Sequence, residues 1–381
     1  MPLPLIPPFP VNPPPRRIAV LAEGQLGDLL MLTPALRAIK QTYPAACTTV
    51  LVLQRRSYEQ RADAGNDAGV VGTPAGGTSV VLLNDPHVDQ VAEIDRQALR
   101  TLSGPARIRA EWSIIRWLRS GRFDVVICTF PQDRFFQWAF LSGARVRVGE
   151  LSGGMSLLLN RRVGVRKRDG GVLRYYCSLA AAAGATVTSW TTRFEIPQEA
   201  RAWADRELPG GEGRIVAIHP GASGMYRVWP PESYAAVADY IQNQKGYRVI
   251  LCGTAFDTEV VEAVRRHGGS DIRVIMTDRG ISGLGALLQR CVLCISNNSG
   301  PRHLAVAVGT PSLAVIPRFD DVEWKIYDDE KRCGTIQSGD SCPACGADTC
   351  RNIVPPGEYF GSTCMRAVTV GQVIARLDSL L

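Results

Sequence analysis

The fold is decided by the stretch Arg17-Ile18-Ala19-Val20-Leu21-Ala22-Glu23-Gly24-Gln25-Leu26-Gly27-Asp28, near the start of the 381-residue chain. The run after Arg17 is apolar, as in a strand buried on both faces of a parallel sheet. A glycine turn follows, and apolar residues then recur at helical spacing from Leu29 to Ile39. A buried strand, a glycine turn and a helix predict the first unit of a doubly wound α/β sheet. Asp28 stands where such sheets bind their ligands.

The alternation of strand and helix runs through the first half of the chain and starts again after Gln198. In the first half we predict further strands at 48–53, 80–83, 123–129 and 146–149. In the second half we predict strands at 215–219, 247–252, 274–276, 292–296 and 312–316, with helices between them. This pattern predicts an α/β protein of two Rossmann-like doubly wound domains facing each other across a cleft.

The bulk composition narrows the class of protein. The net charge is +7 and comes almost entirely from arginine, whose forked guanidinium suits phosphate and carboxylate. This balance fits a nucleotide, a phosphorylated acceptor or an anionic membrane surface. No nucleic-acid-binding motif is present, so we expect no nucleic-acid partner. No apolar run approaches the ~18–20 residues of a membrane span, and no signal peptide is evident, so we expect a cytoplasmic protein.

We divide the chain by composition and pattern. The expected parts are a disordered Pro-rich tail over 1–15, an N-terminal domain over 16–198, a C-terminal domain over 199–332, and a Cys-rich segment with a C-terminal helix over 333–381.

Three further turns follow predicted strands and carry groups suited to a phosphate or a ribose. One is His219-Pro220-Gly221-Ala222-Ser223, with Arg227 placed to pair with a phosphate. In the turn 252–259, Asp257 and Glu259 offer carboxylates to ribose hydroxyls. The last is Asn297-Asn298-Ser299-Gly300-Pro301-Arg302-His303, which begins a helix. Because free amides at a helix N-terminus bind anions, we expect a diphosphate there.

Each of these turns also has a purely structural interpretation. Carboxylates such as Asp28, Asp257 and Glu259 can cap a helix or favour its dipole. Arg227 can be solvated, and His303 is more simply a core histidine. The first turn is not a GxGxxG motif, so dinucleotide binding is weakly supported. The functional interpretation therefore rests on the four turns together.

Taken together, these segments resemble glycosyltransferase family 9, the ADP-heptose:lipopolysaccharide heptosyltransferases. The resemblance runs from about Arg17 to the C-terminus. It is carried by Gly27-Asp28-Leu29-Leu30, Thr33-Pro34-Ala35-Leu36-Arg37, His219-Pro220-Gly221-Ala222, Arg227-Val228-Trp229-Pro230 and Asn298-Ser299-Gly300-Pro301, with 123–127 and 141–144 as further segments. Each piece alone is common, whereas the ensemble is specific for the family.

The resemblance implies a GT-B fold and inverting transfer of heptose, or a related sugar, from an ADP-sugar to a lipopolysaccharide-core-like or other bacterial surface glycan. It implies that the N-terminal domain binds the acceptor beside Gly27 and that Asp28 takes the proton from its hydroxyl. No catalytic metal is implied. The donor would lie on residues of the C-terminal domain: Gly221, Ala222, Ser223, Arg227, Asp257, Glu259, Asn298, Ser299, Gly300 and His303.

Three positions depart from the family pattern. The family usually has Asp where this chain has Asn298, a neutral or small residue where it has Arg302, and often Lys where it has Arg227. A cation at position 227 preserves phosphate binding, whereas Asn298 leaves open a donor other than ADP-heptose. A non-catalytic nucleotide-sugar-binding protein stays an alternative, as does a GT-B-type nucleotide-sugar epimerase, although the chain has only four histidines.

Five of the eleven cysteines lie between Cys333 and Cys364. The spacing of Cys342, Cys345, Cys350 and Cys364 can close a tetrahedral site, so we expect a structural zinc or iron. Disulfides and reduced thiols are the alternatives, and Cys333 is a substitute ligand. The pair Cys291-x-x-Cys294 begins a predicted strand, where residues three apart point to opposite faces, so we interpret it as core thiols.

Arg161-Arg162 and Arg166-Lys167-Arg168 form a basic run late in the first half of the chain. The run is either a solvated surface or a contact for a phosphorylated lipopolysaccharide core or the anionic inner leaflet. Arg161 and Arg162 are therefore candidate acceptor contacts, and peripheral contact with the inner membrane stays open beside the solvated surface.

Overall fold

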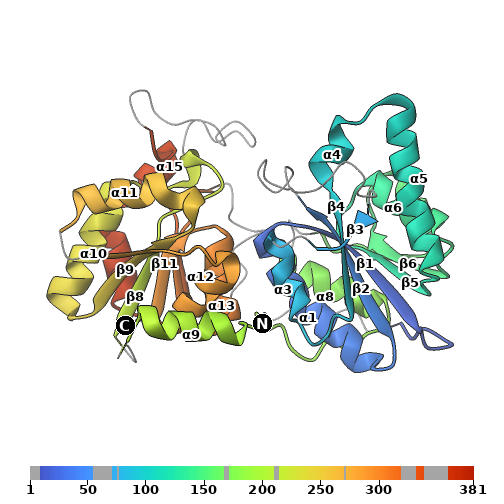
Figure 1. Ribbon diagram of the computed structural model, residues 1–381, viewed down its shortest axis with the longest axis horizontal. Helices are drawn as coiled ribbons and strands as arrows, with labels where there is room; N and C mark the ends of the chain where they lie inside the picture. The colour runs from blue at the N-terminus through green and yellow to red at the C-terminus, as the bar shows by residue number, and fades with distance from the viewer. Residues whose placement is uncertain are drawn as a thin grey trace. The chain divides into compact units, whose positions relative to one another are not determined.

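The computed structural model describes residues 9–54, 71–74, 77–166, 171–209, 214–269, 272–318, 332–338 and 359–381. The chain divides into two compact units, Met1–Thr192 (unit 1) and Arg193–Leu381 (unit 2), drawn in Figure 1. The boundary predicted after residue 198 lies just beyond this division. No helix in the described ranges is both long and apolar enough to cross a membrane.

Unit 1 is built on a seven-stranded sheet of order β3-β4-β2-β1-β5-β6-β7. Its strands are β1 (Arg17–Glu23), β2 (Cys47–Gln54), β3 (Val71–Gly72), β4 (Gln90–Asp95), β5 (Val125–Cys128), β6 (Val146–Glu150) and β7 (Arg161–Val163). All neighbours pair in parallel except β3 and β4. In β1 Val20 pairs with Val50 on one side and Ile127 on the other, so the apolar run that begins the fold is central.

Helices cover both faces of this sheet (Figure 1). On one face α1 (Leu26–Thr42) packs against α8 (Val172–Ala182). On the other, α5 (Gly104–Ser120) packs against α6 (Asp133–Leu141), and their apolar sides share a core with β1, β2 and β5. Shorter elements are η1 (Gly77–Ser79), α3 (Val80–Leu83), α4 (Arg96–Thr101) and η2 (Gly154–Leu158).

The segment 80–83, predicted as a strand, forms the single helical turn α3 instead. A run of four apolar residues fits a short strand or a buried helical turn equally well, because periodicity cannot separate them. In the structure Val81 and Leu82 are both buried, as neighbours on a helix can be, whereas Leu83 is exposed. In unit 1 the sequence analysis missed three strands, β3, β4 and β7.

Residues 9–15, expected to belong to a disordered tail, instead follow a defined path along unit 1. Arg161 donates from Nη1 to the carbonyl of Phe9 at 2.6 Å and from Nη2 to that of Pro10 at 3.0 Å. Val11 is 5% exposed. Gly184 makes room for this segment, since a Cβ there would lie 2.7 Å from the Phe9 carbonyl. Proline-rich composition suggested disorder, but long-range hydrogen bonds fix these residues.

Unit 2 holds a six-stranded sheet of order β10-β9-β8-β11-β12-β13, with every neighbouring pair parallel. Its strands are β8 (Ile215–His219), β9 (Arg248–Gly253), β10 (Arg273–Met276), β11 (Leu293–Asn297), β12 (Ser312–Val315) and β13 (Cys333–Ile336). The first five agree with the predicted strands to within about a residue at each end. The sixth, β13, pairs with β12 and so joins a sheet that we expected to end before residue 333.

The helices of unit 2 also form two layers (Figure 1). They are α9 (Gln198–Glu207), α10 (Pro231–Lys245), α11 (Thr258–His267), α12 (Gly280–Gln289), α13 (Gly300–Ala307), α15 (Thr363–Arg366) and α16 (Val370–Leu377), with the short turns η3 (Met225–Arg227) and η4 (Ala255–Asp257). Helices α9, α12 and α13 pack together, as do α10, α11 and α16. The buried side chains of α16, Val373 and Leu377, belong to the unit 2 core.

Candidate active site

Asp28 lies in the first turn of α1, directly beyond the carboxyl end of β1, and is 4% exposed. The turn before it is fixed by Gly24, whose N–H donates to the carbonyl of Leu53 at 2.9 Å. A Cβ at Gly24 would stand 2.9 Å from that carbonyl oxygen and from the Cα of Gln54, so only glycine fits. Gly27, predicted beside the acceptor, is buried next to Asp28.

Tyr176 holds the Asp28 carboxylate. Its phenol donates to Asp28 Oδ1 at 2.6 Å from helix α8, 148 residues away in sequence. Burial, and then the negative charge of Asp28, raise the pKa of Tyr176 well above its ordinary value, so the phenol keeps its proton and remains a donor. The sequence analysis missed this residue. The available signal was a tyrosine in an apolar, alanine-rich segment, because a buried phenol needs a hydrogen-bond partner.

A second carboxylate ends strand β1. Glu23 is 5% exposed and pairs with Arg96 of α4, with 2.9 Å between Arg96 Nη1 and Glu23 Oε1. The carboxyl edge of the unit 1 sheet therefore carries one carboxylate paired with a cation and another held by a neutral phenol.

Arg161, a candidate acceptor contact, has a structural role in unit 1. Besides the carbonyls of Phe9 and Pro10, its guanidinium donates to the carbonyl of Ala182 at 2.9 Å. It thereby fastens residues 9–10 to the end of α8. Arg162, its neighbour on β7, is exposed. Lys167 and Arg168 of the same basic run lie outside the described residues.

In unit 2, Asn297 joins the turns at the carboxyl edge of the sheet. This fully buried side chain ends β11 and accepts from the backbone N–H of Trp229 at 2.8 Å and from the phenol of Tyr234 at 2.9 Å. Its amide donates to the carbonyls of Pro220 at 2.6 Å and Gly221 at 3.3 Å. All its hydrogen-bonding capacity is used, so the loop after β8 is fixed to the end of β11.

The carboxylate of Asp257, a predicted ribose ligand, is held by Thr254 and His219 of the same unit. Its Oδ2 accepts from the N–H and hydroxyl of Thr254 at 2.8 and 3.0 Å and lies 3.4 Å from Nε2 of His219. A Cβ on Gly221 would come within 1.8 Å of its Oδ1. Burial raises the pKa of Asp257. The hydrogen bond and charge of His219, together with the hydrogen bonds from Thr254, outweigh burial, so the pKa of Asp257 is lowered.

The loop that carries Arg227 is held by the C-terminal segment. The N–H groups of Gly361 and Ser362 donate to the carbonyls of Met225 and Tyr226, each at 2.9 Å. The guanidinium carbon of Arg227 lies 5.8 Å from the centroid of the Tyr226 ring. Earlier in the same loop, Ala222 is half-buried and Ser223 is exposed. No sequence motif pointed to the residues after 359 as a support for this loop.

The third turn brings together two of the positions that depart from the family pattern. Arg302 Nη1 donates to Asn298 Oδ1 at 2.9 Å, and both side chains are buried. Ser299 occupies the N-cap position of α13, and its buried Oγ has no hydrogen-bond partner among the described residues. Gly300 begins the helix beside it. The turn therefore presents a hydroxyl and helix amides, with Arg302 fixing the orientation of the Asn298 amide.

Two further residues predicted to contact the sugar donor are His303 and Glu259. His303 is 3% exposed inside α13, where burial, and then the charge of Arg302, lower its pKa well below the ordinary value. It is a neutral core histidine, which is the simpler of its two interpretations. Glu259 is exposed on α11 and accepts from the phenol of Tyr359 at 3.1 Å.

Of the four predicted metal ligands, Cys342, Cys345 and Cys350 lie outside the described residues. Cys364 is 2% exposed in α15, with its sulfur 3.4 Å from the hydroxyl of Ser362. Within the described ranges no group of three or more His, Cys, Asp or Glu side chains is placed to hold a metal. The thiols of Cys291 and Cys294 are buried, as predicted for core cysteines.

Comparisons with known proteins agree with these observations. The model of glycosyltransferase family 9 (heptosyltransferase) matches residues 111–352. Lipopolysaccharide heptosyltransferase 3 of Escherichia coli K12 is 26% identical over 318 residues, which cover 78% of this chain and 82% of that protein.

Solved structures share the fold over nearly the whole chain. The glycosyl transferase family 9 protein from Veillonella parvula has a TM-score of 0.71 and 21% identity, covering 96% of this chain and 97% of that one. E. coli ADP-heptose lps heptosyltransferase II has a TM-score of 0.68 and 16% identity, covering 96% and 98%. The predicted GT-B fold of two Rossmann-like units is confirmed. With a family model that spans more than half of its length, the chain belongs to glycosyltransferase family 9, the heptosyltransferases, and is a glycosyltransferase.

Proposed function

We propose that the chain transfers heptose, or a related sugar, from an ADP-sugar to a hydroxyl of a lipopolysaccharide-core-like or other bacterial surface glycan. The observation that carries this proposal is the Asp28 carboxylate, buried at the carboxyl end of β1 and held by the Tyr176 phenol. Family membership supports it, since the relative named above is a lipopolysaccharide heptosyltransferase. We assign the reaction to the cytoplasm.

In the proposed reaction Asp28 accepts the proton of the acceptor hydroxyl as its oxygen bonds to the anomeric carbon. The bond from that carbon to the diphosphate oxygen breaks, and the electron pair leaves with ADP. A single displacement inverts the anomeric configuration. Tyr176 fixes one oxygen of the Asp28 carboxylate by its hydrogen bond and so sets the orientation of the group.

Unit 2 would hold the donor. Arg227, the hydroxyl of Ser299 and the first amides of α13 are suited to the diphosphate, whose charge grows as the sugar leaves. The rigid framework of Asn297 and Asp257 supports this assignment, because preorganised donors stabilise developing charge better than mobile ones. The closed surroundings of Asp257 make it a support of this edge more than a direct ribose ligand.

The test is ADP release from ADP-heptose, with and without a heptose-deficient lipopolysaccharide core. We expect release that depends on the acceptor and falls by about 10²–10⁴-fold in Asp28→Ala, the range for loss of a general base. Asp89→Ala, which removes a surface partner of Lys40, is the control and should retain turnover. Unchanged turnover in Asp28→Ala would contradict the base assignment.

Donor identity needs its own experiment because of Asn298. A screen of ADP-, UDP- and GDP-sugars by binding should favour adenine if the donor is an ADP-sugar. The variant Asn298→Asp then asks whether a carboxylate beside Arg302 alters the choice of sugar. Preference for a uridine or guanine nucleotide would overturn the ADP-sugar assignment and leave the transfer reaction standing.

We also propose a structural zinc or iron bound by Cys342, Cys345, Cys350 and Cys364, with no metal required for catalysis. The support is the thiolate spacing alone. Elemental analysis of the purified protein should find the metal in the wild type and in Cys47→Ser, a cysteine on β2 of unit 1, and should not find it in Cys342→Ser. A wild-type protein free of both metals would refute this site.

A further inference from the structure

Exposed apolar side chains gather on three neighbouring segments of unit 1. Helices α5 and α6 lie on one side of the sheet and contact each other (Figure 1), and α6 also contacts η2. Of ten large apolar side chains exposed in the described residues, six lie on or beside these segments. We call them the α5–α6 surface: Ile108, Trp112, Phe140, Leu151, Met155 and Leu157. Ile108 is 60% exposed and Trp112 is 50% exposed, so α5 alone leaves substantial apolar area in water.

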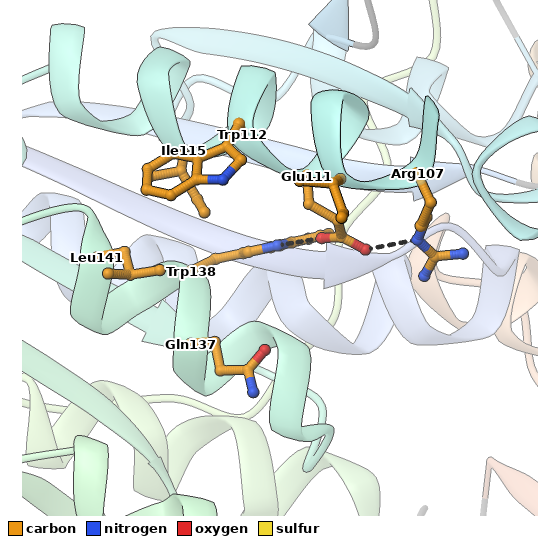
Figure 2. A pocket seen from close by; sticks show the side chains of 8 residues that line it. Arg107, Glu111, Trp112, Ile115, Gln137, Trp138 and Leu141 are labelled. Carbon is orange, nitrogen blue, oxygen red and sulfur yellow. Dashed lines mark hydrogen bonds and ion pairs between the residues drawn. The ribbon is translucent and has the colours of Figure 1, made fainter. Parts of the chain in front are cut away.

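A groove of about 300 Å³ runs between α5 and α6 within this surface. Figure 2 shows Trp112 and Ile115 of α5 above Trp138 and Leu141 of α6. Its one carboxylate, Glu111, accepts from the indole N–H of Trp138 at 2.6 Å and from Nε of Arg107 at 2.8 Å. Five of the eight lining side chains are therefore apolar or aromatic, and the one carboxylate is paired with Arg107.

Arginines accompany the exposed apolar side chains of α5. At 100° per residue, Arg109, Arg116 and Arg119 fall within about 100° of Ile108 on the helical wheel, and Trp112 lies between them. All five are exposed, and within the described part of the chain no carboxylate pairs with the three arginines. The guanidinium carbon of Arg147, a residue of β6, lies 5.5 Å from the ring centroid of Phe140 on α6. The exposed acid of α6, Asp133, is at its N-terminus.

A helix face that combines tryptophan, aliphatic residues and arginine matches the water–lipid boundary of an acidic membrane. The indole ring favours the headgroup level, aliphatic side chains enter the acyl boundary, and arginines bind lipid phosphates. A second copy of the chain fits less well, because a two-fold contact through this surface would set arginine rows against each other. We propose that the α5–α6 surface docks on a bilayer of acidic phospholipid, with Trp112 and Ile108 inserted.

The test is flotation of the full-length protein with vesicles of phosphatidylglycerol and phosphatidylethanolamine, compared with phosphatidylcholine. No sugar donor is present, so the result is independent of the proposed transfer reaction. We expect binding to the acidic vesicles with a blue shift of tryptophan fluorescence. The double variant Ile108→Ser/Trp112→Ser should lower the partition coefficient by at least about tenfold, and Arg116→Gln by about fivefold.

Phe256→Ser is the matched control, since Phe256 is 82% exposed in unit 2 and should bind vesicles as the wild type does. Unchanged melting temperatures will show that the variants fold. The proposal is overturned if the wild type stays with the unbound fraction, or if the double variant floats equally well. Vesicle-independent self-association that disappears in the double variant would also overturn it, because the surface would then belong to a contact between copies.

Discussion

Asp28 and Asp257 each follow a strand at the carboxyl edge of a parallel sheet, one in each unit, yet their surroundings differ. Asp28 accepts a hydrogen bond from the phenol of Tyr176, on a helix distant in sequence. Asp257 is fixed by two bonds from Thr254, by His219 and by the close approach of Gly221. A carboxylate oriented by a phenol in the first turn of a helix is suited to the proposed proton transfer, whereas a carboxylate bonded to Thr254 and His219 is suited to holding a loop. Carboxylates that follow strands in two similar folds therefore predict different chemistry.

The largest difference is expected between Asp28→Asn and Asp257→Asn. We expect Asp28→Asn to lower kcat by about 10²–10⁴-fold with little change in melting temperature, because an amide cannot accept the proton. Asp257→Asn should lower the melting temperature and retain a larger share of turnover, because the amide removes the negative charge beside His219 but takes no part in the proposed proton transfer. Turnover and thermal melting of both variants check this. A stable, inactive Asp257→Asn would reverse the comparison.

The unit 2 edge should be sensitive to Asn297. Asn297→Ala leaves the Trp229 N–H and the Tyr234 phenol buried without their acceptor, and we expect a loss of about 3 kcal/mol in the free energy of unfolding. The control is Asn160→Ala in unit 1, which also removes amide bonds, to Arg147 and Arg145, but at an exposed site. Its loss should be about 1 kcal/mol or less, measured by denaturant unfolding. Equal losses of unfolding free energy in the two variants would show that the buried bonds of Asn297 contribute no more than the exposed bonds of Asn160.

Tyr176→Phe tests whether the hydrogen bond from the phenol to Asp28 contributes to turnover. We expect kcat/KM to fall about tenfold, since one charge-assisted hydrogen bond is lost. Tyr175→Phe removes another buried phenol from the same helix and should keep kcat/KM near the wild-type value. A packing role alone would lower the melting temperature of Tyr176→Phe without lowering its kcat/KM.

The smallest effect is the acid sensitivity of Asp257. Its pKa is lowered in the folded protein, so it contributes stability above the ordinary aspartate value near pH 4 and loses it as the pH falls through the folded value. The gap in melting temperature between wild type and Asp257→Asn should therefore narrow from pH 5 to pH 3. A gap that stays constant over this range would mean that the carboxylate charge contributes nothing.

Local patterns predicted much of this molecule. The strand from Ile215 to His219 has its predicted bounds, and Asp28 lies at the strand end where its turn placed it. Contacts between distant segments could not be predicted. The bond from Tyr176 to Asp28 depends on how α8 packs on α1, and the role of Arg161 depends on carbonyls about 150 residues earlier. Side-chain chemistry at a strand end is local information, whereas the identity of its partner is set by tertiary packing.

The bonds of Arg161 also bear on the order in which unit 1 assembles during synthesis. Residues 9–10 are fastened to the carbonyl end of α8 through this side chain, and the N–H of Phe9 reaches the carbonyl of Ala181 at 3.4 Å. Both ends of this contact exist only after residue 182 has left the ribosome. Residues 9 and 10 therefore cannot form these hydrogen bonds until nearly the whole of unit 1 has been translated. Their docking is one of the last steps in the folding of the unit.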